Sequence, residues 1–197
     1  MSDEKRIYRK SKRAELEEET HVKITESAVA LHGSIGPANT TVSAIAEHAG
    51  VRRSTVYRHF PDDAAIFRAC SSHWMSLNPL PDPAAWAAND DLQNRRLSAL
   101  TSLYEYFRKN ETMLHNVLRD EPVLPALQAV MVAYHGYLKQ ILLLLQSKAN
   151  GRKTLSAAAI GHALNFFSWR SMAIEQGLSD LDSAKLMCGM IERAETP

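Results

Sequence analysis

The residues best suited to a chemical task lie close together, between Arg52 and His59. In the stretch RRSTVYRH, three arginines, a tyrosine, a histidine and two hydroxyl side chains offer hydrogen-bond donors. Groups of this kind bind phosphate oxygens and the edges of nucleobases. The chain has 197 residues and a formal net charge of +1, so its overall field does not attract nucleic acid. The alternative to a local DNA-binding surface is a solvated basic helix face.

Motifs for catalysis or metal binding are missing from the sequence. There is no HExxH, no glycine-rich phosphate loop and no Cys-x-x-Cys, and the eight histidines do not recur at metal-ligand spacing. The two cysteines, Cys70 and Cys188, lie within apolar helical patterns and indicate reduced, buried thiols rather than a disulfide framework. We therefore expect no catalytic residue, no metal and no cofactor, and a protein that is not an enzyme.

A membrane location is also disfavoured by the sequence. The longest aliphatic run, ILLLL at 141–145, is far too short to cross a bilayer. The N-terminus is charged and has no apolar signal segment. We expect a cytoplasmic protein without a membrane partner.

Helical spacing of apolar residues predicts an all-α protein of two domains. No strand-like alternation of four or more residues stands out. The NPLPDPAAW segment, 78–86, reads as a linker because three prolines fall within six residues. It separates domain 1–77 from domain 78–197. The expected helices span 20–35, 41–49, 52–59, 62–77, 92–107, 113–118, 127–145, 154–176 and 180–194.

Residues 41–59 have the spacing of a helix-turn-helix corner. Ala46 is small enough to let the second helix approach, and Gly50 can adopt the left-handed conformation that reverses the chain. Val51 is placed to fill the angle between the helices. Ile45 and Val56 are the expected inward anchors. The outward face of the second helix then consists of Arg53, Ser54, Tyr57 and Arg58.

The segment TTVSAIAEHAGVRRSTVYRHFPDDAAIFRAC resembles the DNA-binding signature of the TetR family of transcriptional regulators. The resemblance covers about 24–70 and implies a three-helix DNA-binding domain followed by a helical ligand-binding and dimerisation domain. It implies that Thr41 caps the first motif helix and touches a phosphate. It places further DNA contacts at Arg53, Ser54, Thr55, Tyr57 and His59.

Two positions depart from that signature. Arg52 replaces the usual small helix cap, which removes a cap of about 1 kcal/mol but adds a possible phosphate or guanine contact. Asp63 stands where the family usually has a phosphate-binding lysine. Compensation could come from Arg52 or from the basic arm, whose alternative interpretation is a solvated, disordered tail. The arm contains Lys5, Arg6, Arg9, Lys10, Lys12 and Arg13.

The second half is rich in aromatic and large apolar residues, interrupted by polar ones. Most of these residues must be ordinary core, but together they suit a cavity with a few polar anchors, the usual form of a small-molecule site. We expect a mainly apolar effector there. Its candidate ligands are Trp74, Tyr104, Phe107, Met113, His115, Arg119, Tyr134, His162, Asn165 and Phe166.

The last two predicted helices are apolar nearly all round, which requires burial on all sides. A partner subunit can supply the cover, and the TetR resemblance implies a four-helix bundle between two subunits. Phe167, Cys188 and Ile191 are the candidate interface residues. The sequence thus predicts a homodimeric repressor, released from a palindromic double-stranded DNA operator by a small effector. The alternative is a TetR-type regulator or activator without an effector.

Overall fold

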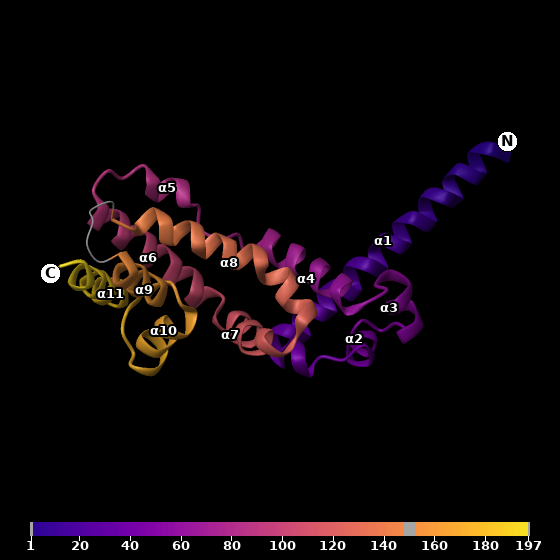
Figure 1. Ribbon diagram of the computed structural model, residues 1–197. Helices are drawn as coiled ribbons and strands as arrows, with labels where there is room; N and C mark the ends of the chain where they lie inside the picture. Colours follow the sequence, from indigo (N-terminus) through magenta and orange to yellow (C-terminus); the bar gives the residue numbers. More distant parts are fainter. Residues whose placement is uncertain (1, 148–152, 197) are drawn as a thin grey trace. The chain divides into compact units, whose positions relative to one another are not determined.

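A computed structural model describes residues 2–147 and 153–196 (Figure 1). Within these ranges the chain is helical and contains no strand, which confirms the all-α fold class. The chain divides into two compact units. Unit 1 comprises residues 1–77 and 116–130, and unit 2 comprises residues 78–115 and 131–197. The first boundary coincides with the start of the predicted linker, whereas residues 116–130 lie in unit 1 rather than with the rest of 78–197.

Unit 1 is built on a helical core. Its helices are α1 (Ser2–Ser34), α2 (Val42–His48), α3 (Arg53–His59) and α4 (Asp63–Leu77), with the short 3-10 turn η1 (Pro37–Asn39) before α2. The 3-10 turn η2 (Glu121–Val123) lies in the 116–130 segment. Apolar side chains from α1, α2, α3 and α4 form one buried cluster, because each helix carries apolar residues on one face. The buried members are Ile24, Ala28, Ile45, Ala46, Ala49, Val56, Phe60, Ile66 and Cys70.

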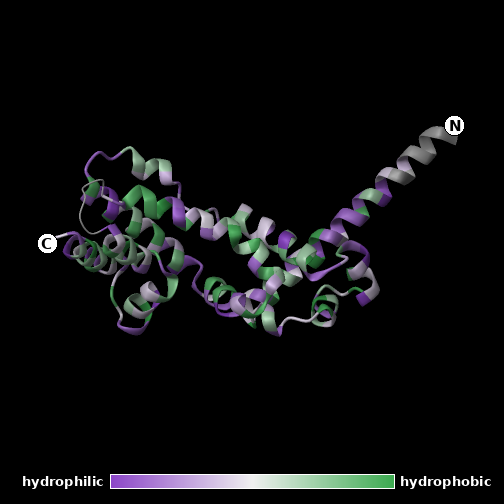
Figure 2. Ribbon diagram, viewed as in Figure 1, coloured by the Kyte–Doolittle hydropathy of each residue, from purple (hydrophilic) through white to green (hydrophobic). Residues whose placement is uncertain are grey.

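Unit 2 contains α5 (Pro83–Ala87), α6 (Leu92–Lys109), α9 (Lys153–Ala163), α10 (Phe166–Arg170), the π-helical turn η3 (Ser171–Glu175) and α11 (Asp180–Glu195). Helix α11 packs against α6 and α9. Two helices contain the unit boundary: α7 (Glu111–Asp120) and α8 (Pro125–Leu145). The C-terminal part of α8, which carries the ILLLL run, is strongly apolar (Figure 2). No helix in the described part of the chain is both long and apolar enough to cross a membrane.

Three local expectations need correction. The predicted linker contains a helix, α5, because Asp82 caps it and Trp86 is buried. The predicted helix 154–176 is interrupted at Leu164–Asn165, where the side-chain Oδ1 atom of Asn165 accepts from the amides of Phe167 and Ser168 and caps the start of α10. The basic arm is helical backbone continuous with α1 rather than an irregular tail.

Candidate DNA-binding site

The corner between α2 and α3 has the geometry that its sequence predicts. Gly50 adopts a φ of 63°, a conformation that strongly favours glycine. The Val51 amide donates to the Ala46 carbonyl at 2.9 Å and closes the turn. Ile45 and Val56 are buried, and Val51 packs against the same cluster. The predicted roles of these residues in the corner are therefore confirmed.

Helix α2 begins at a side-chain cap, and α3 does not. The Thr41 hydroxyl accepts from the Ala44 amide at 3.1 Å, which confirms Thr41 as the N-cap of α2. Arg52 occupies the N-cap position of α3 and makes no side-chain capping bond. Its guanidinium is exposed to solvent. Helix α3 therefore lacks a side-chain cap, as the sequence predicts, and Arg52 lies at the surface.

The polar residues of α3 lie on one exposed face. Arg53, Ser54, Tyr57 and Arg58 are exposed, while Thr55 and His59 are partly covered. The Nη2 group of Arg53 donates to the Tyr57 hydroxyl at 2.9 Å, and its guanidinium carbon lies 5.4 Å from the Tyr57 ring centre. Because the two residues are one helical turn apart, this pairing holds both side chains along the same face.

A groove of about 460 Å³ brings several of these residues together within unit 1. Thr41 from the start of α2 lines it, together with Arg53 and Tyr57 from α3. Asp63, at the start of α4, also lines the groove and adds a negative charge where a phosphate contact would otherwise be favoured. Thr41, Arg53 and Tyr57 therefore line one concave surface, although they come from two elements.

His59 lies at the inner edge of this face. Burial, and then the charges of Arg58 and His21, lowers the pKa of His59, so its imidazole is neutral at neutral pH. Its ring centre lies 6.0 Å from that of His21 on α1. Among the described residues, no group hydrogen-bonds to the buried Nε2 atom of His59. A buried water molecule would satisfy that atom.

The structure does not gather the ten candidate effector ligands in one place. Trp74 and Arg119 belong to unit 1, and Arg119 pairs there with Asp120. Tyr104, Phe107 and Phe166 are buried in an aromatic core of unit 2 that also contains Trp169. His162 and Asn165 are exposed, and the Asn165 side chain caps α10.

Met113, His115 and Tyr134 are partly covered side chains of unit 2. The Nδ1 atom of His115 is buried, and no described residue hydrogen-bonds to it. The same holds for the hydroxyl of Thr101, a residue that the sequence patterns did not single out. Unmatched polar atoms inside an apolar unit are the type of anchor that a bound small molecule satisfies.

The three candidate interface residues differ in accessibility. Phe167 is 42% exposed, Cys188 is partly covered, and Ile191 is fully buried within its own chain. Ile191 therefore packs the interior of unit 2, where α11 meets α6 and α9, and has no surface left for a partner. Other large apolar side chains of α9, η3 and α11 are exposed instead, namely Leu155, Ile174, Leu181 and Leu186.

Comparison of sequence identifies the family of the N-terminal segment. Residues 24–70 match the family model described as bacterial regulatory proteins of the tetR family. That segment contains the α2–α3 corner and the exposed face of α3. Comparison with curated proteins finds no match.

Comparison of structures extends the likeness in fold to most of the chain. A TetR-like transcriptional regulator from Rhodococcus sp. RHA1 has a TM-score of 0.63 at 17% identity, covering 88% of this chain and 94% of the other. NalD from Pseudomonas aeruginosa, the secondary repressor of the MexAB-OprM multidrug efflux pump, has a TM-score of 0.59 at 17% identity, covering 90% and 96%. The matched family and both structures are transcriptional regulators rather than enzymes.

Proposed function

Because residues 24–70 belong to the tetR family of bacterial regulatory proteins, we propose that this chain is a DNA-binding transcriptional repressor. The observation that carries the proposal is the exposed face of α3, which presents Arg53, Ser54, Tyr57 and Arg58 beyond a helix-turn-helix corner. A helix of this kind enters the major groove and reads base edges. Thr41, Arg52, Thr55 and His59 supply contacts to the sugar-phosphate backbone.

We propose that the protein acts as a homodimer on a palindromic operator in the bacterial cytoplasm. Exposed apolar side chains on α9, η3 and α11, together with Phe167, form the surface that a second copy covers. The two copies of α3 then lie about 34–36 Å apart, or wider on a long or bent site. The description of NalD as a repressor supports repression over activation.

We also propose a small, mainly apolar effector that binds in unit 2 and lowers DNA affinity. His115 and Thr101 support this proposal, since each has a buried polar atom without a described partner. Met113 and Tyr134 are further candidate contacts. The alternative is a regulator or activator without an effector, in which these polar atoms are satisfied by water.

One experiment tests the function directly. The wild-type protein is used to select duplexes from a random-sequence pool, with Arg53→Ala as the matched control. We expect the wild type to enrich a palindrome, and transcription through that palindrome in vitro to fall when protein is added. Failure to enrich any sequence would contradict DNA reading, whereas a rise in transcription would favour the activator.

A further inference from the structure

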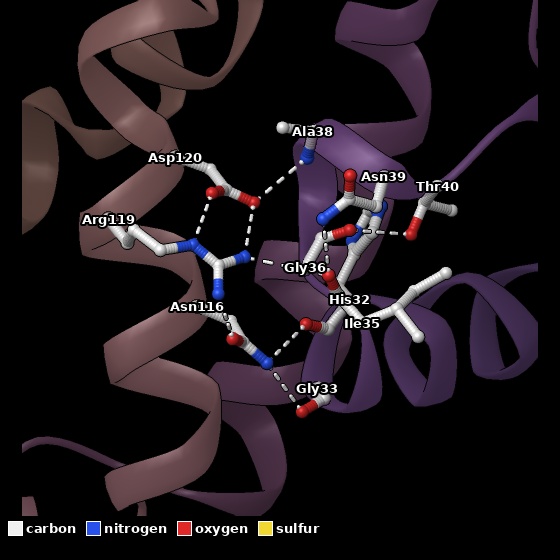
Figure 3. Close-up of polar contacts among 10 residues, drawn as sticks. All are labelled: His32, Gly33, Ile35, Gly36, Ala38, Asn39, Thr40, Asn116, Arg119 and Asp120. Atoms are coloured by element: carbon white, nitrogen blue, oxygen red, sulfur yellow. Dashed lines mark hydrogen bonds and ion pairs between the residues drawn. The ribbon is translucent and has the colours of Figure 1, made fainter.

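The C-terminal part of α7 is joined to the end of α1 and to the link that follows it by a group of polar contacts, most of them part-buried (Figure 3). The group consists of Asn116, Arg119 and Asp120, which we call the α7 clamp. All three belong to unit 1, although they lie outside the matched segment 24–70. Each contacts residues 33–40, which comprise the end of α1 and most of the link to α2 and which we call the 33–40 connection.

Asn116 holds the end of α1. Its side-chain amide donates to the carbonyls of His32 at 3.3 Å and Gly33 at 2.8 Å. These carbonyls belong to the last turn of α1, where a helix has no intrahelical donors left for them. Because Asn116 is buried, loss of its amide would leave these carbonyls without that donor in a site with little water.

Asp120 holds the start of η1. Its Oδ2 atom accepts from the Ala38 amide at 2.9 Å, at a turn whose N-cap, Gly36, has no side chain to do so. The carboxylate therefore supplies from α7 the cap that the local sequence lacks. Gly36 has a φ of 90°, and a Cβ at this position would overlap the Arg119 and Asp120 side chains. Glycine at this position thus lets the clamp approach the connection.

Arg119 holds the other two clamp residues in place. Its guanidinium donates to both carboxylate oxygens of Asp120, at 2.7 and 3.1 Å, and to the side-chain Oδ1 atom of Asn116 at 3.0 Å. It also reaches the Ile35 carbonyl at 3.5 Å. A bidentate arginine–carboxylate pair of this kind fixes the orientation of the carboxylate as well as its position.

The clamped connection leads directly into the proposed DNA-binding surface. The Thr40 hydroxyl donates back to the Gly36 carbonyl at 2.8 Å, and Thr41 then caps α2. Thr41 lines the same groove as Arg53 and Tyr57. A shift of the connection would therefore move the start of α2 relative to α3.

We propose that Asn116, Arg119 and Asp120 are positioning residues for DNA binding, acting through the 33–40 connection on Thr41 and α2. The inference rests on the proposed function, because it concerns the same DNA-binding surface. It also makes residues outside 24–70 part of the working DNA-binding unit. None of the three residues lines the groove that contains Thr41, Arg53 and Tyr57, so their loss should reduce affinity without removing a direct contact.

The test uses full-length variants and the duplex that the wild type selects from a random pool. Asp120→Ala and Asn116→Ala should each weaken binding to that duplex by about tenfold. Asp120→Asn keeps an acceptor for the Ala38 amide and should stay within about threefold of wild type. Asp91→Ala is the matched control, since it removes the same charge and a helix cap in unit 2. It should bind as the wild type does.

Hydrogen exchange distinguishes a local effect on the 33–40 connection from general destabilisation of the protein. Amides of residues 38–45 should exchange faster in the clamp variants, while amides of α6 and α11 keep wild-type rates. Wild-type affinity despite faster exchange at 38–45 would overturn the proposal, and so would unchanged exchange at those amides. If the two alanine variants fail to fold, Arg119→Ala replaces them in both measurements. Its side chain is 42% exposed, so its removal should disturb folding less. A wild type that selects no duplex would instead contradict the proposed function.

Discussion

Arg53 and Tyr57 contact each other twice on α3, through a hydrogen bond of 2.9 Å and through a guanidinium carbon 5.4 Å from the ring centre. The pairing fixes two long side chains before DNA arrives, which lowers the conformational entropy that binding must remove. A guanidinium has five N–H donors, so the bond to Tyr57 leaves others for a base edge. The pair is therefore arranged to bind as one unit.

We predict that Arg53→Ala costs about 1–3 kcal/mol on the selected duplex and relaxes preference at one base pair. Tyr57→Phe should weaken binding to all duplexes more evenly, because the contact that we propose for its hydroxyl is to a phosphate, which every duplex presents. Fluorescence anisotropy on the selected and a scrambled duplex measures both. Since the two side chains touch, the double variant should lose less than the sum of the single variants. Strict additivity would show that the pair does not act together.

Assembly should depend on the exposed apolar residues and not on Ile191. Leu186 is 56% exposed on α11, so Leu186→Asp should give a folded monomer with weakened operator binding. Ile191→Asp should instead destabilise the chain by about 3 kcal/mol or more, because it places a charge in the interior of unit 2. Sedimentation and thermal melting separate the two outcomes. A wild type that sediments as a stable monomer at micromolar concentration would rule out the homodimer.

The stability of unit 1 should fall in acid because of His32. Burial beside Phe67 lowers the pKa of His32 from 6.5 to about 4, although the Asp120 charge opposes this shift. Between these values the unfolded chain binds more protons than the folded chain, so the free energy of unfolding decreases as pH falls from 6.5 to 4. The full effect is about 3 kcal/mol, with no further His32 contribution below pH 4.

Urea unfolding of wild type and His32→Gln at pH 7 and pH 4.5 measures this contribution. The variant should lose less stability between the two pH values than the wild type does. His48→Gln is the matched control, because His48 is exposed on α2. Equal pH dependence in His32→Gln and wild type would show that His32 titrates normally in the folded chain.

Arg96 should be the most costly charge to remove in unit 2. It is fully buried, donates to the Leu145 carbonyl at 2.9 Å and pairs with Glu195 at 2.6 Å. Arg96→Ala should reduce the free energy of unfolding by about 3–5 kcal/mol, because Glu195 and the carbonyl lose their partner. Arg193→Ala, an exposed neighbour on α11, should change it by less than about 0.5 kcal/mol. Thermal or urea unfolding measures the stability of both variants. An equal loss of stability in the two would contradict the prediction.

Effector and DNA should each weaken the binding of the other by the same factor. A ligand found by its stabilisation of the free protein should bind more weakly when the selected duplex is present, by a coupling of about 1–3 kcal/mol. Thermodynamic linkage requires the ligand to weaken DNA binding equally. Calorimetry with and without the duplex measures the change in ligand affinity. Fluorescence anisotropy with and without the ligand measures the change in DNA affinity. Equal ligand affinity in both conditions would favour the regulator without an effector.

The matched variants for the effector site are His115→Ala and His162→Ala. Loss of the His115 imidazole should weaken ligand binding, because its buried Nδ1 atom is a candidate anchor. His162 is exposed on α9 and should matter little. The reverse order of effects would place the ligand elsewhere in the protein.

The helical fold and the DNA-binding corner can be predicted from the amino-acid sequence, because both depend on local patterns. Apolar residues at helical spacing define a helix whatever its neighbours are. Gly50 has a conformation that few other residues adopt, and Thr41 caps the helix that starts beside it. The outward face of α3 follows from Val56 pointing inward, since a helix with one buried anchor exposes the opposite side.

Which distant residues meet depends on the three-dimensional packing. The sequence predicts Arg119 as a polar anchor for a ligand, whereas in the structure it holds Asp120 against the 33–40 connection. The sequence predicts Ile191 as an interface residue, whereas its own chain covers it. Periodicity shows that a side chain is apolar or that a face must be buried, but not which element covers it. That choice depends on how helices far apart in the sequence pack together, and no local pattern encodes it.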